Sequence, residues 1–339
     1  MHAYMTRGDG IDRIERVQLP EPEPGAREVL VELRAAALNY RDLLVVRGVG
    51  GWKPSGPRIP VSDGVGIVVS AGRSVSRVRV GDRVAGIFLP RWLDGDLDAG
   101  AYGDSLGGAA ADGVMTERRV FDEAAVVPVP AHLSDLEAAT LPVAAVTAWH
   151  AVRRRSNVAA GESVLIQGTG GVAIAALQFV RALGGRAIVT SSSDEKLARA
   201  RALGADATIN YRTHPEWESQ VLALTGGRGV DHVLELVGGE NLNRALRAVR
   251  LSGSISFIGL LAGVSAPINT YEFVTRNVRI HGIETGSRAM FEEMNAFLAE
   301  HRIHPVMDRV FPEAEFPEAL RYLEQGAHFG KVGIEFEPA

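Results

Sequence analysis

The sequence of 339 residues contains no cysteine. This absence excludes disulfide bonds, thiolate nucleophiles and every zinc site that depends on cysteine ligands. The sequence also lacks an apolar run near the roughly 18 residues that a membrane-spanning helix requires. Its first ten residues, MHAYMTRGDG, do not have the basic and then apolar layout of a signal peptide. We therefore expect a soluble cytoplasmic protein with no membrane partner.

An excess of positive charge is missing as well. The formal net charge is −5, and nucleic acids or anionic membranes need a clustered positive field, so we expect neither as a partner. Hydrophobic residues make up 46% and charged residues 23% of the chain, which provides for buried cores and gives no sign of disorder. Because single cores stop growing near roughly 250 residues, this length predicts two domains.

The first 130 or so residues read as a β-rich domain. Residues 29–34 alternate at period two, residues 64–72 form an apolar stretch bounded by glycines, and residues 78–84 read as strand, turn and strand. Short strands at this spacing predict a barrel-like or rolled sheet. Residues 91–113 are rich in Gly, Asp and Ala without a period, which predicts a long surface loop.

After Pro130 the pattern changes to strands that alternate with helices. Ser134 and Glu137 form a capping-box signature at the start of the first helix. Apolar strands are then predicted at 163–167, 186–190, 207–210, 230–237, 254–259 and 277–283, with helices at 172–183, 194–203, 215–224 and 241–249. Strict alternation predicts a doubly wound parallel sheet. From about residue 286 the tail, with helices at 290–301 and 317–325 and a strand at 330–336, should return to the first domain.

The motif that carries the clearest chemistry is Gly168-Thr169-Gly170-Gly171-Val172-Ala173, which has the form G-x-G-x-x-A. It follows a predicted strand and opens a predicted helix, the context that makes this motif specific. The glycines allow a tight turn and a close approach of the backbone, and Ala173 allows close packing of helix and sheet. Free N–H groups at the helix N-terminus then bind a pyrophosphate. The motif predicts a dinucleotide site.

The end of the next strand bears on the choice of coenzyme. A site for NAD usually has an acid there, which binds the 2′-hydroxyl of the ribose. Here the strand-end position is Ser191 or Ser192, whose hydroxyls can bind a phosphate, and Lys196 supplies positive charge one helical turn later. Tyr211 follows the third strand and closes the same pocket. The sequence favours NADP over NAD.

Asp194 is the argument for the less favoured coenzyme, NAD. A shift of a few residues would make its carboxylate the ribose-binding acid. In the alternative interpretation Asp194 caps a helix, which agrees with its place before Glu-Lys-Leu.

Several segments resemble, in order, the zinc-free branch of the medium-chain dehydrogenases/reductases, which includes quinone oxidoreductases and alcohol dehydrogenase-like enzymes. The matching segments are EVLVELRAAALNYRD from Glu28, DGVGIV from Asp63, VGDRV from Val80, ATLPVAAVTAW from Ala139, the glycine motif, residues 191–196, ALGAD from Ala202, and GKV from Gly330. The resemblance implies an α/β fold in which a GroES-like β-barrel catalytic domain (1–128 and 286–339) is split around a Rossmann domain (129–285). It also implies an active site between the two domains.

In the zinc enzymes of this family, the segment aligned with residues 39–42 carries a cysteine ligand and the one aligned with residues 62–64 a histidine. Neither residue is present here, so no metal site is expected. Hydrogen-bond donors must then stabilise the charge that hydride transfer develops. The resemblance points to Asn39 for orienting the substrate or nicotinamide, Tyr40 as a proton donor, Arg41 as an electrostatic donor if it faces inward, and Asp42 as its partner or a loop anchor. For each of the four a purely structural role stays open.

Further residues are assigned to the coenzyme. By resemblance Thr147 contacts the nicotinamide, and Ile258 and Gly259 lie at the carboxyl end of a sheet strand, where ligands bind in such folds. Ser287 and Arg288 are expected to line the coenzyme cleft, although Arg288 reads equally well as a surface charge. Residues 277–283 form a sheet edge that pairs across a two-fold axis in the family, which predicts a homodimer.

The function expected from the sequence is NADPH-dependent reduction of a small molecule, namely a quinone, an activated alkene or a carbonyl compound. Two alternatives stay open. One is zinc-free oxidation of an alcohol with NAD. The other is a non-catalytic NADPH-binding protein that acts as a sensor or a structural component.

Overall fold

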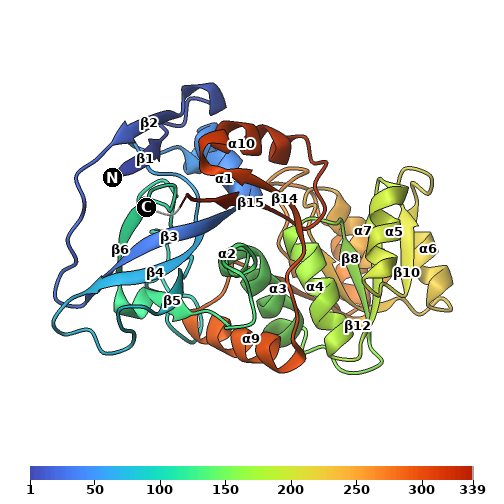
Figure 1. Ribbon diagram of the computed structural model, residues 1–339. Helices are drawn as coiled ribbons and strands as arrows, with labels where there is room; N and C mark the ends of the chain where they lie inside the picture. The colour runs from blue at the N-terminus through green and yellow to red at the C-terminus, as the bar shows by residue number, and fades with distance from the viewer. Residues whose placement is uncertain (338–339) are drawn as a thin grey trace. The chain divides into compact units, whose positions relative to one another are not determined.

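The computed structural model describes residues 1–337 and divides the chain into two compact units. The first unit comprises Met1–Val146 and the residues from Thr285 onward, and the second comprises Thr147–Glu284. The first unit therefore consists of two chain segments, the blue to green part and the red part of Figure 1. The sequence placed the domain limits after residues 128 and 285, so residues 129–146 lie in the first unit rather than with the second.

A seven-stranded sheet forms the first unit. Its strands, in spatial order, are β14 (Met307–Pro312), β15 (Lys331–Glu335), β3 (Glu28–Leu38), β4 (Asp63–Ala71), β5 (Arg83–Gly86) and β7 (Val126–Pro128), and β6 (Arg118–Asp122) also pairs with β3. All pairs are antiparallel except β14 and β15. Two short strands, β1 (His2–Met5) and β2 (Glu15–Gln18), form an antiparallel pair of their own.

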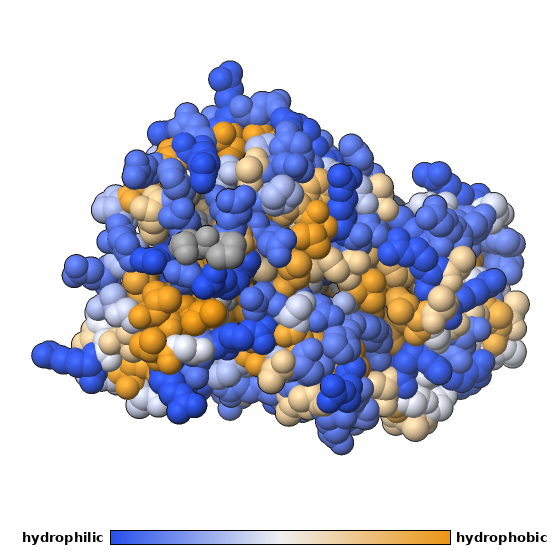
Figure 2. All heavy atoms as spheres, viewed as in Figure 1, coloured by the Kyte–Doolittle hydropathy of each residue, from blue (hydrophilic) through white to orange (hydrophobic). Residues whose placement is uncertain are grey.

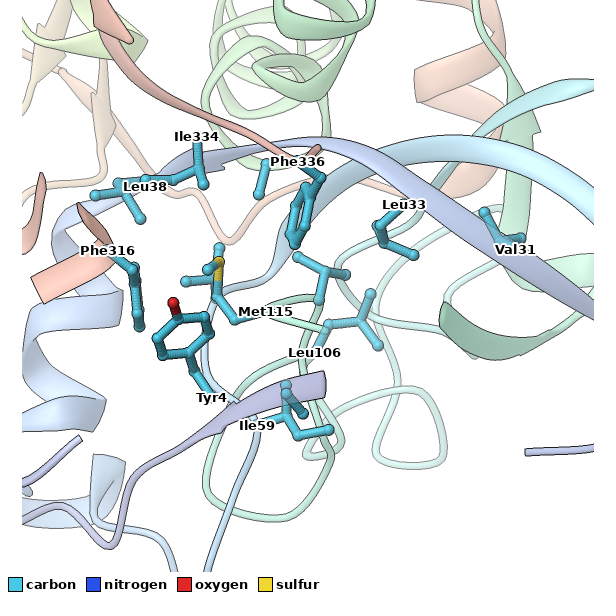
Figure 3. Close-up of a cluster of buried hydrophobic side chains, with 14 of the residues drawn as sticks. Tyr4, Val31, Leu33, Leu38, Ile59, Leu106, Met115, Phe316, Ile334 and Phe336 are labelled. Carbon is cyan, nitrogen blue, oxygen red and sulfur yellow. The ribbon is translucent and has the colours of Figure 1, made fainter. Parts of the chain in front are cut away.

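The core of the first unit follows from the alternation in β3. Val31 and Leu33 point to the same side of the strand and are at most 3% exposed. Figure 3 shows them in a buried cluster with side chains from both ends of the chain, among them Tyr4, Phe316 and Phe336. The rings of Tyr4 and Phe316 lie edge to face, with centroids 5.3 Å apart. The C-terminal segment thus completes the core that the N-terminal segment begins.

The helices of the first unit are α1 (Tyr40–Val46), α2 (Asp135–Ala139), α9 (Arg288–His301) and α10 (Phe316–Glu324). The capping box predicted for α2 is confirmed, since Ser134 Oγ accepts from the amide of Glu137 at 3.2 Å and Glu137 Oε2 accepts from that of Ser134 at 2.8 Å. α2 packs against β3, β4 and β15, which explains why it belongs to the first unit. Helical turns continue through η4 (Leu141–Ala145), α3 (Val146–Trp149) and η5 (His150–Arg155).

The second unit is a six-stranded parallel sheet. Its spatial order is β10 (Ala207–Asn210), β9 (Arg186–Ser191), β8 (Ser163–Gln167), β11 (Val230–Glu235), β12 (Val249–Phe257) and β13 (Arg279–Gly282). The helices are α4 (Gly171–Ala182), α5 (Asp194–Ala202), α6 (Trp217–Leu224), α7 (Asn241–Ala248) and α8 (Thr270–Thr275). This is the doubly wound order expected from the sequence, and it reverses between β8 and β11. Ligands bind such sheets at the carboxyl ends of the strands beside the reversal.

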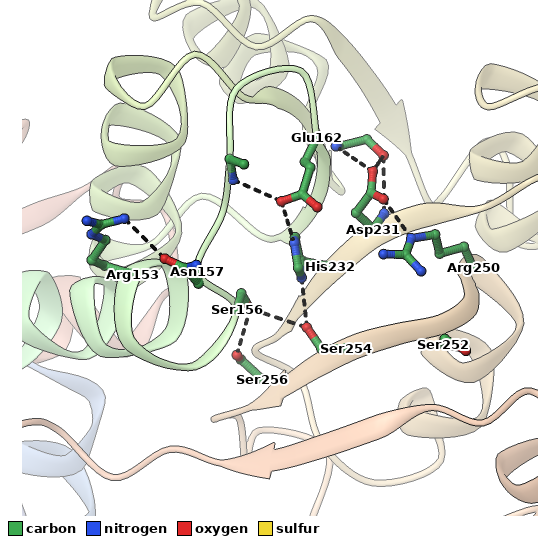
Figure 4. A network of polar contacts seen from close by, with 12 residues as sticks. Arg153, Ser156, Asn157, Glu162, Asp231, His232, Arg250, Ser252, Ser254 and Ser256 are labelled. Carbon is green, nitrogen blue, oxygen red and sulfur yellow. Dashed lines mark hydrogen bonds and ion pairs between the residues drawn. The ribbon is translucent and has the colours of Figure 1, made fainter.

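A network of polar contacts lies at the amino end of this sheet (Figure 4). Asp231, at the start of β11, accepts hydrogen bonds from the amide and hydroxyl of Ser163, both at 2.9 Å, and from Arg250 Nε at 2.7 Å. His232, on the opposite face, lies 3.0 Å from a carboxylate oxygen of Glu162 through Nε2 and 2.7 Å from Ser254 Oγ through Nδ1. These contacts link the start of β8 and of β11 with residues of β12.

Two segments of the first unit differ from the expectation. In residues 78–84 the predicted turn is present, with Gly81 at φ +95°, but a strand begins only at Arg83. Residues 91–113 contain neither helix nor strand, as predicted. They do not all lie at the surface, however, because Trp92 and Leu106 are each 2% exposed. Two large apolar side chains therefore anchor this loop in the core.

The surface is mainly hydrophilic on the face shown in Figure 2, where smaller apolar patches lie between the polar side chains. Within residues 1–337, no helix is long and apolar enough to span a bilayer.

Candidate functional site

The glycine motif forms the turn between β8 and α4. Gly168 has φ +84°, a backbone conformation that L side chains rarely adopt, and its amide donates to Thr190 O at 2.8 Å. Gly170 is the N-cap residue of α4, and no side chain of the described residues caps this helix. Ala173 is 1% exposed. None of the described side chains therefore occupies the backbone N–H groups of the first turn, which can bind an anion. Val172 lies within this turn, and Thr169 lies just before it.

The hydroxyl groups expected at a 2′-phosphate lie where the second and third strands end. Ser191 is the last residue of β9 and is 4% exposed. The amide of Tyr211, which follows β10, donates to Ser191 O at 3.1 Å, so the two residues are neighbours. Ser192 precedes α5 and Lys196 lies in its first turn. The structure therefore brings these four predicted residues to one edge of the sheet.

Asp194 is the first residue of α5 rather than its cap. The cap is Ser193, whose Oγ accepts from the amide of Lys196 at 3.3 Å, so the interpretation of Asp194 as the cap was wrong. The Asp194 carboxylate instead accepts a hydrogen bond of 2.8 Å from Asn210 Nδ2. This contact occupies one of its two oxygens.

A buried polar cluster, which the sequence analysis missed, lies where the strand order reverses. Gln167 ends β8, Glu235 ends β11, and Asn241 begins α7. Asn241 Nδ2 donates to Gln167 Oε1 and to Glu235 Oε1, each at 2.8 Å. Gln167 Nε2 is buried without a partner among the described residues. The signal that could have found this cluster is polar residues at the ends of two buried strands.

Burial raises the pKa of Glu235, and hydrogen bonds from Asn241 and from the amides of Gly238 and Val237 oppose the shift without cancelling it. The backbone oxygen of Glu235 accepts from the amides of Ile258 and Gly259, at 2.9 and 3.0 Å. A Cβ at Gly259 would lie 1.9 Å from the carbonyl carbon of Leu236. Only glycine fits this approach, so the backbone at Ile258 and Gly259 is held tightly beside the cluster.

Three further residues were assigned to the coenzyme. Thr147 is 4% exposed and lies in α3. Ser287 and Arg288 belong to the first unit, where Ser287 Oγ caps α9 by accepting from the amide of Met290 at 3.3 Å. Arg288 Nη1 donates to Ala124 O at 3.1 Å. These contacts hold α9 in place, and the expected roles toward a coenzyme stay predictions.

The candidate catalytic segment, residues 39–42, spans the junction of β3 and α1. Asn39 is the N-cap residue of α1, and its backbone N–H donates to Asp42 Oδ2 at 2.8 Å. Asp42 is fully buried, and burial raises its pKa although the neighbouring Arg41 opposes this shift. The ring of Tyr40 is 48% exposed. Asp42 therefore anchors the segment, while Asn39 and Tyr40 have atoms available for other partners.

Arg41 points into the protein. Its Nη1 donates to the carbonyl oxygens of Leu106 and Gly107, at 2.9 and 3.0 Å, and to Asp42 Oδ1 at 3.1 Å. The guanidinium group also lies over the rings of Trp52 and Phe88. These contacts favour an anchoring role for Arg41 on the loop 91–113 over a role as a donor to substrate.

Lys331 joins the catalytic segment from the far end of the chain. β15 pairs with β3 so that Val332 lies opposite Leu38, and this register places Lys331 beside Asn39. Lys331 Nζ lies 2.6 Å from Asn39 Oδ1, 2.7 Å from Leu38 O and 3.5 Å from Asp63 Oδ2. Burial lowers the pKa of Lys331, while the carboxylates of Asp63 and Asp42 oppose the shift. The segment GKV from Gly330 carries part of the family resemblance, but it assigned no role to Lys331.

The donor set at this place does not fit a catalytic zinc ion. Asn39 lies in the segment aligned with the cysteine ligand of the zinc enzymes, and Ser62 in the one aligned with the histidine. Asn39 and Ser62 offer neutral amide and hydroxyl groups, which are not usual zinc ligands. The one carboxylate of the second segment, Asp63, lies 3.5 Å from the Lys331 ammonium, whose charge would repel a divalent cation. Within residues 1–337, no three His, Asp or Glu side chains are grouped so that they could hold a metal ion.

Comparisons with known families agree with both units. The family model described as alcohol dehydrogenase GroES-like domain matches residues 25–131, and the one described as zinc-binding dehydrogenase matches residues 171–300. The chain belongs to the medium-chain dehydrogenase/reductase superfamily, in its alcohol dehydrogenase-like branch. It is an NAD(P)H-dependent oxidoreductase, and the fold class expected from the sequence is confirmed.

Among its relatives is a zinc-type alcohol dehydrogenase-like protein of Schizosaccharomyces pombe, 40% identical over 97% of this chain and 96% of that protein. The crystal structure of a putative alcohol dehydrogenase from Sinorhizobium meliloti is 40% identical, has a TM-score of 0.92, and is matched over 99% of this chain and 100% of the other. A structure described as an NAD-dependent alcohol dehydrogenase is 34% identical, with a TM-score of 0.88 and coverage of 99% of both chains.

Proposed function

We propose that this enzyme transfers a hydride from NADPH to a quinone, an activated alkene or a carbonyl compound without the help of zinc. The observation that carries the proposal is the Lys331 ammonium, which lies 2.6 Å from Asn39 Oδ1 in the segment aligned with a zinc ligand. The amide of Asn39 lies in the segment that carries a metal ligand in the zinc enzymes, and a fixed cation lies beside it. The charge that develops on the acceptor must then be stabilised by hydrogen-bond donors.

The preference for NADPH rests on the end of β9. Ser191 and Ser192 stand where an NAD site usually has an acid, and Lys196 adds a positive charge nearby. The glycine turn 168–173 would hold the pyrophosphate on the amides of α4, with Thr147, Ile258 and Gly259 expected at the nicotinamide. NADPH supplies the hydride when bound. Asn39 would donate a hydrogen bond to the hydride acceptor. Tyr40, whose ring is exposed, would donate a proton to the reduced product.

A second candidate function is NAD-dependent oxidation of an alcohol. It is favoured by the Asp194 carboxylate, which Asn210 holds beside the end of β9, and by the likeness to the solved NAD-dependent alcohol dehydrogenase.

Steady-state assays separate the two. The purified protein, treated with a chelator and checked by elemental analysis, is incubated with NADPH and 1,4-benzoquinone, 2-cyclohexenone or benzaldehyde. In parallel it is given NAD and benzyl alcohol, with and without added zinc. We expect oxidation of NADPH with at least one acceptor, at a rate that zinc does not change. Reduction of NAD by alcohol that depends on zinc would overturn the proposal.

We also propose that two copies of the chain associate through the edge of the second unit. Within residues 1–337, β13 is an edge strand that pairs with β12 alone, and unpaired edges need covering. Large apolar side chains are exposed in the segment between these two strands, at Leu260, Leu261, Val264, Ile268, Tyr271 and Val274. Apolar groups of this kind mark association surfaces, and a two-fold axis would pair them with themselves.

Light scattering after size-exclusion chromatography tests this assembly. The wild type should elute as a dimer, and Val274→Glu, at a side chain that is 72% exposed, should shift the mass toward that of a monomer. Val80→Glu, in the first unit and 60% exposed, is the matched control and should leave the mass unchanged. A monomeric wild type, or a variant that stays dimeric, would argue against this interface.

A further inference from the structure

Lysine is rare in this chain, and one of its lysines is buried. The 36 basic side chains are arginines except at Lys53, Lys196 and Lys331. Lys331 is 5% exposed, and charged side chains seldom reach such burial without partners. An ammonium group is a compact charge with donors in three directions, whereas guanidinium is a planar fork. Three oxygens, from Leu38, Asn39 and Asp63, lie 2.7, 2.6 and 3.5 Å from Nζ.

These contacts fix the orientation of the Asn39 amide. An ammonium group only donates hydrogen bonds, so the Asn39 atom that lies 2.6 Å from Nζ has to be its oxygen, Oδ1. The amide nitrogen, Nδ2, must then face away from Lys331. A cation on the oxygen also polarises the amide, which strengthens the N–H groups as donors.

The Asn39 Nδ2 atom, which faces away from Lys331, has no hydrogen-bond acceptor among the described residues. Asn39 is 9% exposed, and its Nδ2 is buried without a hydrogen-bond partner among residues 1–337. A buried donor without a partner costs about 1–3 kcal/mol. An oxygen atom of a bound ligand would remove this cost, and buried unpartnered donors are rare enough to need such an explanation.

We propose that Lys331 is a positioning residue, which aims the Asn39 Nδ2 donor at the oxygen of the hydride acceptor; this inference rests on the proposed function. When the hydride and its electron pair reach the acceptor carbon, negative charge develops on that oxygen. Asn39 donates a hydrogen bond to it and gives up no proton, so protonation of the product comes from another group or from water. Lys331 itself does not touch the substrate.

Asn39→Asp tests the Asn39 Nδ2 donor separately from Lys331, which positions it. The aspartate keeps an oxygen toward Lys331 but has no N–H group for the acceptor. With NADPH and 1,4-benzoquinone, kcat should fall about a hundredfold, the order expected when a developing oxyanion loses a donor. The Kd of NADPH, from coenzyme fluorescence, should stay within about twofold, and the Tm should not fall. A variant with the kcat of the wild type would overturn the assignment.

A pair of variants tests the positioning. Lys331→Met removes the donor, whereas Lys331→Gln keeps an N–H group for Asn39 Oδ1. Both variants remove the cation beside Asp63, so they share that cost and differ in the contact with Asn39. We expect kcat to fall about tenfold in Lys331→Met and less than threefold in Lys331→Gln, with Lys53→Met unchanged as the surface control. Equal losses in the two variants would make the role of Lys331 merely structural.

The experiment separates failure of this inference from failure of the proposed function. The proposed function fails if the wild type binds NADPH and reduces no acceptor. The series is then run with NAD and benzyl alcohol, where the same donor would hold the alkoxide oxygen, and the same ratios are expected. If Lys331→Met does not fold, Lys331→Arg takes its place, because it keeps a charged donor but changes the geometry at Asn39 Oδ1. A loss of kcat in Lys331→Arg no larger than that in Lys331→Gln would then contradict the positioning role. A wild type inactive in both directions overturns the inference together with the function.

Discussion

Replacing Asp231 by alanine should lower the free energy of unfolding of the second unit by about 1–3 kcal/mol, because the buried donors of Ser163 lose their acceptor. The guanidinium groups of Arg228 and Arg250 are partly exposed and can turn to water. Asp231 is 3% exposed and accepts from Arg228, Arg250 and both polar groups of Ser163. Figure 4 shows its side chain beside Arg250. Urea denaturation followed by tryptophan fluorescence and by far-UV circular dichroism would measure the loss.

The pH dependence of stability gives a second readout of the same residue. Burial alone would raise the pKa of Asp231, but hydrogen bonds from Arg228, the Ser163 amide and Arg250 outweigh it and hold the pKa well below its ordinary value. A carboxyl with a depressed folded-state pKa stabilises fully above its unfolded value, about 3.9, and this stabilisation is lost as the pH falls through the folded value. The difference between wild type and Asp231→Ala should therefore be constant near pH 7 and shrink below about pH 4.

The control is Glu318→Ala in α10, which removes an exposed i,i+3 ion pair with Arg321. Exposed pairs of this kind contribute about 0.2–1 kcal/mol, so this variant should change stability little at any pH. If Asp231→Ala cost no more than Glu318→Ala, the network would not hold the sheet as inferred.

The second unit was predictable because its signals are local. The apolar strand 163–167, the glycine turn and the helix after it follow each other within about twenty residues. The residue types required by the turn, such as glycine at φ +84° in position 168, are the ones that a sequence pattern can reveal. The same holds for the α2 capping box, whose partners are three residues apart.

The candidate catalytic site was predictable only in part, because its contacts are not local. Asn39 could be found from its segment, but Lys331 lies 292 positions further along the chain and reaches it only through the pairing of β15 with β3. Arg41 could not be assigned an orientation from the alternation of side chains, and its carbonyl partners at 106 and 107 come from a loop without a pattern. In each case the missing information is the register or path of a distant segment, which composition and period do not contain.

Ser191→Asp should weaken binding of NADPH about a hundredfold and leave the Kd of NADH unchanged or lower. The carboxylate would stand at the end of β9, where an acid binds the 2′-hydroxyl of NAD and repels a 2′-phosphate. Two like charges about 4 Å apart repel by about 4 kcal/mol at an effective dielectric constant near 20. Adaptation of side chains and solvent leaves about 2–3 kcal/mol of this, which is thirtyfold to a hundredfold or more in Kd. Titration of each reduced coenzyme, followed by its fluorescence, measures both constants.

Two control variants separate the effect of the new charge from the loss of the hydroxyl group and from the exact position of the charge. Ser191→Ala removes the hydroxyl without adding charge and should weaken NADPH by tenfold or less, since a neutral hydrogen bond contributes about 0.5–1.5 kcal/mol. Ser193→Asp keeps an acceptor at the cap of α5, two residues further on, and should have the smaller effect of the two aspartates. A wild type that binds NADH more tightly than NADPH would instead assign the ribose to Asp194. In that case Asp194→Ser should be the variant that weakens NADH, because the carboxylate that Asn210 holds in place would be the one that binds the ribose.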